Sequence, residues 1–202
     1  MNDFNTNNYT VVKKAISTER SKFIYDYISL RRKIANYLFQ KKLISPYTKF
    51  FGHWHDPQVP NTYAVYGDTV METLLLELKP LMEKETEKDL VEMYSYCRIY
   101  KKDDVLYRHK DRTSCEVSTT LFLGGDPWPI YLDPTQDNAQ PGIKVDLETG
   151  DMLVYKGCIL EHWRESFQGN DCAQVFLHYN TKNENSEKNK YDKREFIGVP
   201  DK

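Results

Sequence analysis

The chain has 202 residues, a net charge of −2 and four cysteines. This length fits one domain of roughly 100–200 residues, and a composition of 40% hydrophobic and 29% charged residues supports a packed core. The near-neutral charge argues against a dedicated nucleic-acid-binding protein, and no apolar run approaches the roughly 18–20 residues of a membrane span. Since the first residues do not resemble a secretory signal, we expect a cytoplasmic protein with free thiols.

The N-terminal part of the chain is predicted to begin with a frayed polar tail over residues 1–8. Ser17 or Thr18 can cap a helix that runs to about Lys42, because apolar residues recur there at helical spacing. These residues are Phe23, Tyr27, Leu30, Ile34, Tyr37 and Leu38.

Residues 51–67 are rich in proline, glycine and aromatics without a sustained period, which is typical of a long binding loop. Asp68 then caps a second predicted helix, which Pro80 is expected to kink or end. Its apolar stripe is Met71, Leu74, Leu75, Leu78 and Met82. Together, residues 17–88 are predicted to form a helical support.

Residues 90–180 read as short strands separated by turns, which indicates a sandwich or jelly-roll core. Because helices come first and strands follow, the fold class is predicted to be α+β. We expect one domain over residues 9–180, followed by a polar tail over residues 181–202.

Three residues of the strand-rich part form a candidate metal site. His109 and Asp111 are two positions apart, so on an extended segment they project to the same side. His162 lies on a later predicted strand and would be a third ligand. Two histidines and one carboxylate form the facial triad of non-haem Fe(II) oxygenases. The alternative is that these are incidental surface residues.

Arg164 lies two residues after His162 and is expected to point the same way. A buried arginine is costly without an anion, and a dicarboxylate cosubstrate bound to the metal would supply one. The alternative is an ion pair with Glu161, Glu165 or Glu116.

These motifs, over about residues 92–180, resemble the prolyl-4-hydroxylase-like branch of the 2-oxoglutarate/Fe(II)-dependent dioxygenases. The matching segments are Arg98-Ile99-Tyr100, His109-x-Asp111, Thr119 to Leu123, Gly150 to Tyr155, and His162. The resemblance implies a double-stranded β-helix, a jelly-roll of cupin type, supported by the N-terminal helices. It also implies Fe(II) held by His109, Asp111 and His162.

By the same resemblance, the reaction would use 2-oxoglutarate and O2 to hydroxylate an unactivated C–H bond, releasing succinate and CO2. Tyr100 matches a tyrosine that hydrogen-bonds the cosubstrate; core packing is its alternative role. The sequence departs from the family where a lysine or arginine usually follows the distal histidine by nine to twelve residues. Arg164 is the best substitute, and Gln174 could assist it.

The substrate implied is a prolyl or other peptidyl residue, or a small molecule, and Tyr63, Tyr96 and Arg98 are candidate contacts. Two alternative functions are a cupin-like metal-binding domain, non-catalytic or isomerase-type, and an oxidative nucleic-acid demethylase. The net charge of −2 disfavours the demethylase.

Overall fold

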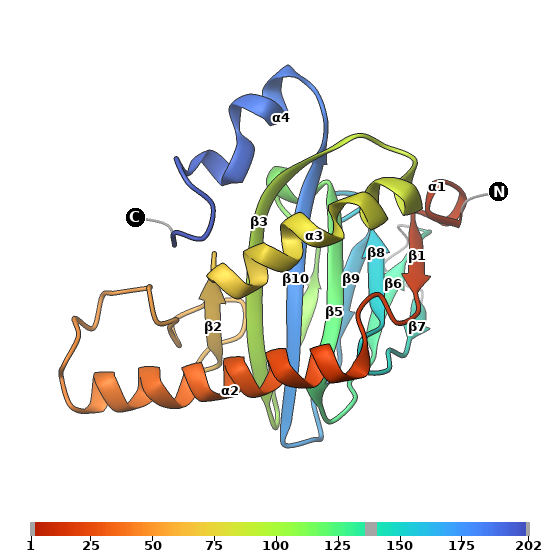
Figure 1. Ribbon diagram of the computed structural model, residues 1–202. Helices are drawn as coiled ribbons and strands as arrows, with labels where there is room; N and C mark the ends of the chain where they lie inside the picture. The colour runs from red at the N-terminus through yellow and green to blue at the C-terminus, as the bar shows by residue number, and fades with distance from the viewer. Residues whose placement is uncertain (1–2, 136–140, 201–202) are drawn as a thin grey trace.

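The computed structural model describes residues 3–135 and 141–200. Its strands form two sheets, and two long helices lie against one of them (Figure 1). The helices are α1 (Asp3–Asn7), α2 (Thr18–Gln40), α3 (Thr69–Thr86) and α4 (Glu184–Lys188), with short 3-10 turns at Thr113–Cys115 and Lys190–Lys193. The strands are β1 (Tyr9–Val12), β2 (Tyr63–Tyr66), β3 (Leu90–Lys101), β4 (Leu106–His109), β5 (Val117–Gly125), β6 (Ile130–Asp133), β7 (Ile143–Val145), β8 (Met152–Tyr155), β9 (Glu161–Arg164) and β10 (Asp171–Thr181).

Over the described residues, the strands form two antiparallel sheets. The larger has the order β1-β8-β5-β10-β3-β2, and the smaller has the order β4-β9-β6-β7. The predicted mixture of helices and strands is confirmed, although β1 precedes α2, β2 precedes α3, and α4 follows the last strand. The predicted loop over residues 51–67 differs in part, because β2 lies inside it and pairs with β3.

Both long helices begin at the predicted capping residues. The Ser17 hydroxyl accepts a hydrogen bond from the Arg20 amide at 3.2 Å, and the Asp68 carboxylate accepts one from the Val70 amide at 3.0 Å. The prediction is that Pro80 kinks or ends the helix. α3 continues past Pro80 to Thr86. The buried side chains of Met82 and Thr86 keep the final turns packed on the protein despite the amide lost at the proline.

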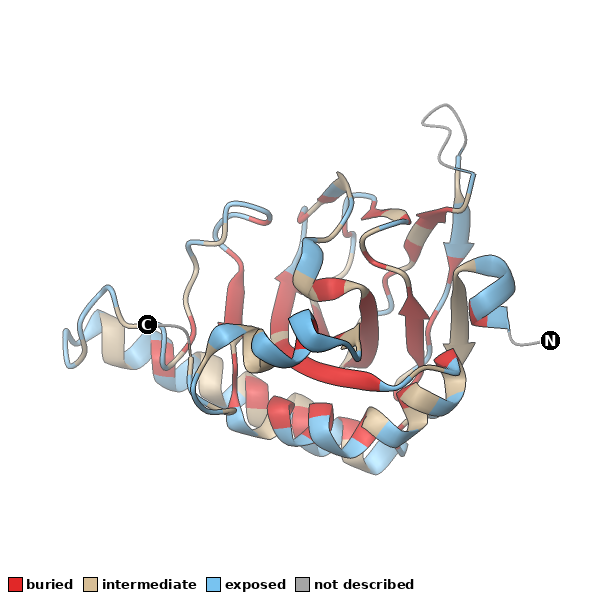
Figure 2. Ribbon diagram, turned by 90° about the horizontal axis from the view of Figure 1, so that it is seen from above, coloured by how far each residue is buried: buried red, intermediate tan, exposed pale blue. Residues whose placement is uncertain are grey.

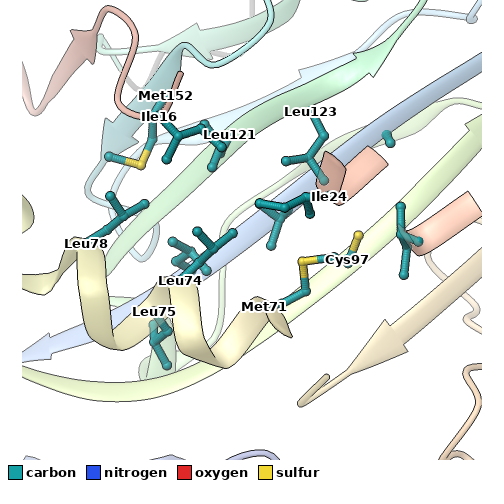
Figure 3. Packing of buried hydrophobic residues seen from close by; sticks show 14 of the residues in the cluster. Ile16, Ile24, Met71, Leu74, Leu75, Leu78, Cys97, Leu121, Leu123 and Met152 are labelled. Atoms are coloured by element: carbon teal, nitrogen blue, oxygen red, sulfur yellow. The ribbon is translucent and has the colours of Figure 1, made fainter. Parts of the chain in front are cut away.

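The first hydrophobic core lies between the long helices and the larger sheet (Figure 3). The predicted stripe of α3 is buried in it. α2, in contrast, buries Ser21, Ile24, Ile28 and Ala35, whereas most of its predicted apolar stripe is exposed on the outer surface (Figure 2). Small side chains let a helix approach a sheet closely, so this less apolar face makes the contact.

A second core fills the space between the two sheets. Tyr100, Phe122 and Leu153 of the larger sheet pack with Leu106 and Leu132 of the smaller sheet, and all five side chains are buried. This core fixes the smaller sheet against the larger one, and the smaller sheet carries the candidate metal site.

The two segments predicted as polar tails both contact the rest of the domain over residues 3–8 and 181–200; residues 1–2 and 201–202 lie outside the described residues. Phe4 of α1 is fully buried. Near the other end, Arg194 forms a buried ion pair of 2.6 Å with Glu72 of α3. Other contacts attach the same segments, because the Asn8 carbonyl accepts a hydrogen bond from the Lys156 amide and Asp192 accepts hydrogen bonds from Arg112 and Tyr66. Within residues 3–135 and 141–200, no helix has the length and apolarity to cross a membrane.

The Glu72–Arg194 pair gives a test of the C-terminal anchor. Glu72→Ala leaves a buried guanidinium without its carboxylate, so the free energy of unfolding should fall by about 3–5 kcal/mol. Urea unfolding measures this change. Glu77 pairs with Arg20 at the surface, and Glu77→Ala should cost about 1 kcal/mol or less. Equal losses in the two variants would contradict a structural role for the C-terminal segment.

Candidate metal centre

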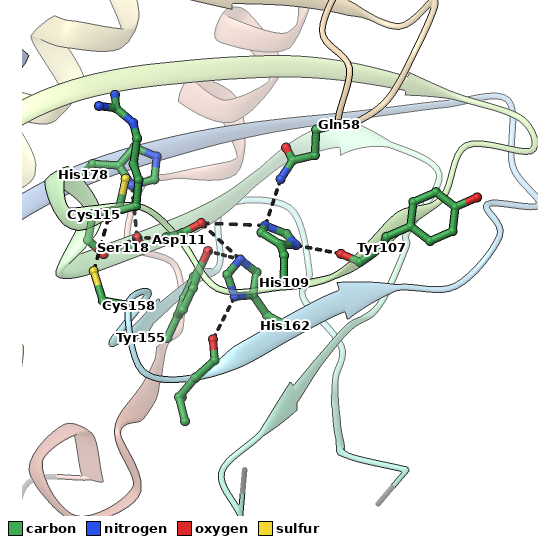
Figure 4. A network of polar contacts seen from close by, with 12 residues as sticks. Gln58, Tyr107, His109, Asp111, Cys115, Ser118, Tyr155, Cys158, His162 and His178 are labelled. Carbon is green, nitrogen blue, oxygen red and sulfur yellow. Dashed lines mark hydrogen bonds and ion pairs between the residues drawn. The ribbon is translucent and has the colours of Figure 1, made fainter. Parts of the chain in front are cut away.

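The centre of the site is the antiparallel pair of β4 and β9. In their register His109 lies opposite His162, and the two imidazole rings are 4.3 Å apart between centroids. Asp111 follows β4, and its amide donates a hydrogen bond of 2.9 Å to the Gly157 carbonyl. Two strands and one turn therefore bring the three predicted ligands together (Figure 4).

The ligand atoms are close enough to share one ion. Oδ1 of Asp111 lies 3.4 Å from Nε2 of His162 and 3.7 Å from Nε2 of His109. One ligand atom from each of the three residues lies within 4.8 Å of the others. This donor set and spacing fit a divalent transition metal.

Hydrogen bonds to backbone carbonyls set the orientation of both imidazoles. Nδ1 of His109 donates to the Tyr107 carbonyl at 2.6 Å, and Nδ1 of His162 donates to the Leu160 carbonyl at 3.1 Å. With Nδ1 donating to a carbonyl, Nε2 of each ring is the atom left to bind a metal.

The carboxylate of Asp111 is held ionised. Burial alone would raise its pKa, but the interaction with His162 and the hydrogen bond from the Ser118 hydroxyl keep the pKa well below its usual range. The Ser118 hydroxyl donates to Oδ2 at 2.7 Å, which leaves Oδ1 toward the two imidazoles. The chain thus presents two imidazole nitrogens and one anionic oxygen.

Comparison with solved structures finds the same fold in known oxygenases, although no family model and no curated protein sequence matches the chain. A Pseudomonas putida prolyl-4-hydroxylase aligns with a TM-score of 0.65 and 11% identity over 90% of this chain and 96% of that one. HygX from Streptomyces hygroscopicus, solved with nickel and 2-oxoglutarate, aligns with a TM-score of 0.61 and 16% identity, covering 89% and 85%. A viral collagen prolyl hydroxylase from Paramecium Bursaria Chlorella virus-1, solved with 2-oxoglutarate, gives 0.54 and 10%, covering 87% and 97%.

The chain has the fold of the 2-oxoglutarate/Fe(II) oxygenases. The prolyl-4-hydroxylase-like architecture suggested by the sequence motifs is confirmed at the level of the fold. Within this oxygenase fold, the triad lies beside a cavity of about 270 Å³. The cavity is lined by Gln58, Tyr94, Tyr96, Arg98, Tyr100, Leu106, His109, Lys110, Asp111, Arg112, Cys115, Ile130, Tyr155, His162, Phe176 and His178.

Alternation along β3 brings Tyr94, Tyr96, Arg98 and Tyr100 to this cavity. Tyr63 does not reach it. In the β2–β3 pair Tyr63 lies opposite Ile99, and both side chains belong to the core under the helices. Strand alternation therefore turns Tyr63 away from the metal ligands.

Arg164 is fully buried beside the second core and, among the described residues, has no acidic partner. Its guanidinium donates to the Trp128 carbonyl and to the Thr120 hydroxyl, the latter at 3.3 Å, and its Nε has no hydrogen-bond acceptor. Burial lowers the pKa of this guanidinium from its ordinary value.

The ion pairs considered for Arg164 as alternatives are not formed. Glu161 pairs instead with Arg108, Glu116 pairs with Lys88, and Glu165 accepts a hydrogen bond from the Trp163 indole. The oxygenase fold thus contains a buried positive charge without a carboxylate of its own.

Gln174 and Tyr100, the other predicted cosubstrate contacts, occupy different places. Gln174 does not line the cavity. It is buried on β10, and its carbonyl accepts a hydrogen bond of 2.9 Å from Thr120, which also contacts Arg164. Tyr100 is fully buried, lines the cavity, and accepts a hydrogen bond of 3.3 Å from Arg98.

Gln58 is a site residue that was not predicted from the sequence. It reaches the site from the predicted binding loop. Both terminal nitrogens of Arg98 donate to the Gln58 carbonyl at 3.2 Å. This fixes the amide so that its nitrogen lies 2.9 Å from Nε2 of His109. The neighbouring Val59 is buried in the core between the sheets and anchors the loop. Loop composition alone gives no signal for which residue makes this contact.

Gln58 should compete with a metal ion. Nε2 of His109 has one lone pair, so it either accepts the Gln58 N–H or binds metal. Removing a hydrogen bond worth about 0.5–1.5 kcal/mol should tighten metal binding about 2- to 10-fold in Gln58→Ala. Calorimetric titration with Co(II) measures this. Gln168→Ala, at an exposed glutamine outside the cavity, should not change the affinity, and weaker binding by Gln58→Ala would contradict the competition.

The neighbour of Ser118 on the side away from the triad is His178, whose Nδ1 lies 3.0 Å from the Ser118 hydroxyl. Burial lowers the pKa of His178 to about 4, from an ordinary value of 6.5. Because the folded-state pKa is depressed, the stability from the neutral imidazole is complete above about pH 6.5 and is lost as the pH falls toward 4.

We therefore expect His178 to contribute about 3 kcal/mol to the acid loss of unfolding free energy between pH 6.5 and pH 4. Urea unfolding of the metal-free protein at a series of pH values measures the slope. His178→Gln removes the titrating group and should flatten the slope by that amount. Identical slopes in the two proteins would show that His178 does not control acid stability.

Proposed function

We propose that the protein is an Fe(II)- and 2-oxoglutarate-dependent dioxygenase that hydroxylates an unactivated C–H bond. The observation that carries this proposal is the convergence of His109, Asp111 and His162 ligand atoms within 4.8 Å beside a cavity. A divalent iron held there would bind 2-oxoglutarate and O2 and supply the oxidising chemistry, with succinate and CO2 as co-products.

The two sheets would form the double-stranded β-helix predicted from the sequence, within a domain over residues 9–180. The packed core between the sheets supports this arrangement. The buried segments at both ends would complete the domain.

Arg164 is the proposed anchor for the distal carboxylate of 2-oxoglutarate. A carboxylate would supply the acceptor that Nε of this buried guanidinium lacks, and the arginine fork matches a carboxylate in two hydrogen bonds. Thr120 already contacts both Arg164 and Gln174, so the three residues would form one polar end for the cosubstrate. Tyr100 would contact it from the cavity side.

The remaining side chains would orient the substrate and exclude water. Tyr96 and Phe176 line the cavity as apolar walls, and the Tyr96 hydroxyl and Arg98 both bind Asp56 of the loop. This rigid aromatic wall suits the ring of a prolyl residue, so a prolyl or other peptidyl substrate is proposed. The solved structure of HygX with hygromycin B shows that this fold also accepts a small molecule.

The decisive experiment measures succinate formed from 2-oxoglutarate by the Fe(II)-loaded protein in air, without added substrate. The wild-type chain should turn over slowly, and His109→Ala should form none because a metal ligand is lost. Co(II) binding by calorimetry checks this cause independently. Metal binding without any succinate would favour the cupin-like, non-oxygenase alternative.

Arg164→Ala should weaken 2-oxoglutarate binding about 10- to 100-fold, the effect of losing hydrogen bonds to a charged group. The measurement is the anaerobic dissociation constant of 2-oxoglutarate with metal bound. Arg164→Lys should recover part of the affinity, and Arg20→Ala at the surface should have no effect. Unchanged affinity in Arg164→Ala, with metal binding intact, would leave the triad in place and place the cosubstrate anchor elsewhere.

A further inference from the structure

The outer face of α2 carries an apolar stripe that is largely exposed, although one member, Tyr27, packs partly on the first core and donates a hydrogen bond of 2.8 Å to Asp68. The α2 stripe consists of Phe23, Tyr27, Leu30, Ile34 and Tyr37, spaced alternately by four and three residues. This spacing makes a straight apolar line along a helix, as in helices that pack lengthwise on another helix. Four members are largely in solvent: Phe23 is 69% exposed, Leu30 58%, Ile34 43% and Tyr37 56%.

The stripe is not the core face of the helix. Ile24 and Ile28 lie on the opposite side of α2 and are buried against the larger sheet. Figure 1 shows α2 as an outer layer in front of the larger sheet, and the exposed fractions place Phe23, Leu30, Ile34 and Tyr37 in solvent. Contiguous apolar surface of this kind marks an interaction site in a folded protein.

The charges at the two ends of the stripe are complementary to each other. Glu19 lies in the first turn of α2, and Lys41 lies at its C-terminal cap; both are exposed. Neither forms an ion pair with another described residue. The stripe is centred on Leu30, so two antiparallel copies of α2 that cross there place Glu19 of each copy opposite Lys41 of the other. A parallel pair would place like charges together.

The shape of the surface beside Phe23 supports the same register. A cavity of about 170 Å³ opens between α2 and α3, lined by Arg20, Phe23, Ile24, Val70, Thr73 and Leu74. In the antiparallel arrangement, Tyr37 of the second copy lies opposite Phe23, where this largely apolar cavity can receive its ring. Each copy offers both the ring and the cavity, as a two-fold symmetric interface requires.

We propose that the α2 stripe is the interface of a homodimer in which the two α2 helices pack antiparallel about Leu30. The inference does not rest on the proposed enzymatic function, because α2 contributes no ligand and no cavity-lining residue to the metal centre. Burying the four exposed side chains against their copies removes apolar surface from water, which drives the association.

The first test is the mass of the purified full chain in solution, measured by light scattering and sedimentation equilibrium over a range of concentrations. The wild-type protein should approach twice the chain mass of 23.9 kDa as the concentration rises. Leu30→Glu places two carboxylates together at the two-fold axis and should give the mass of one chain. Because Leu30 is exposed, the melting temperature of this variant should stay close to that of the wild type.

The matched control is Ile143→Glu, which adds the same charge at an exposed apolar residue of β7, in the other sheet. This variant should dimerise as the wild type does. A wild-type protein that stays at the mass of one chain at every concentration overturns the proposal and leaves the stripe to a different protein partner. A dimer that persists in Leu30→Glu also overturns it, because the interface then lies elsewhere.

A charge exchange tests the antiparallel register. Glu19→Lys alone and Lys41→Glu alone each place like charges at the ends of the stripe, so each should raise the dimer dissociation constant. The double variant restores opposite charges and should return the constant toward the wild-type value. Additive weakening in the double variant would contradict the antiparallel register.

Discussion

The antiparallel pairing of β4 with β9 is the constraint on which the candidate metal centre depends. It sets His109 opposite His162, although 52 positions separate the two residues along the chain. Asp111 can complete the triad only because the turn after β4 bonds to the Gly157 backbone. A slip of one residue in this register would move one imidazole to the other face of the sheet, and the three ligand atoms would no longer lie together. The core between the sheets prevents that slip, since Leu106 of β4 and Leu132 of β6 are buried in it.

The space between the sheets contains two groups of polar side chains, one around Asp111 and one around Arg164. At one, the carboxylate of Asp111 is balanced by two imidazoles and by the Ser118 hydroxyl. At the other, Arg164 is buried with carbonyl and hydroxyl partners only. Burying a guanidinium without a carboxylate is costly, and the proposed distal carboxylate of 2-oxoglutarate would offset that cost.

The loop before β2 contacts both β3 and the candidate metal ligands, through Asp56 and Gln58. Arg98, on the cavity face of β3, holds both Asp56 and Gln58 and so sets the position of the loop over the metal ligands. The adjacent residue, Val59, is buried in the second core, between the two sheets. One buried arginine therefore holds this loop beside the cavity, while α2, which carries the stripe, contributes no residue to the lining of that cavity.

Short-range chemistry is enough to predict the local elements, and ligand types are enough to nominate the candidate metal ligands. Capping at Ser17 and Asp68, the apolar stripe of α3 and the alternation along β3 follow from short-range chemistry, and the H-x-D pair with a later histidine follows from ligand types. Tertiary structure decided the rest. The face that α2 buries depended on how closely a sheet could approach Ser21 and Ala35, which no periodicity reveals. Tyr63 points into the first core because it pairs opposite Ile99. Gln58 reaches His109 because Val59 anchors the loop in the second core. The polar ends of the chain are held on the fold by contacts between residues far apart in sequence, among them the burial of Phe4 and the ion pair of Arg194 with Glu72, and the local composition of a segment does not reveal such contacts.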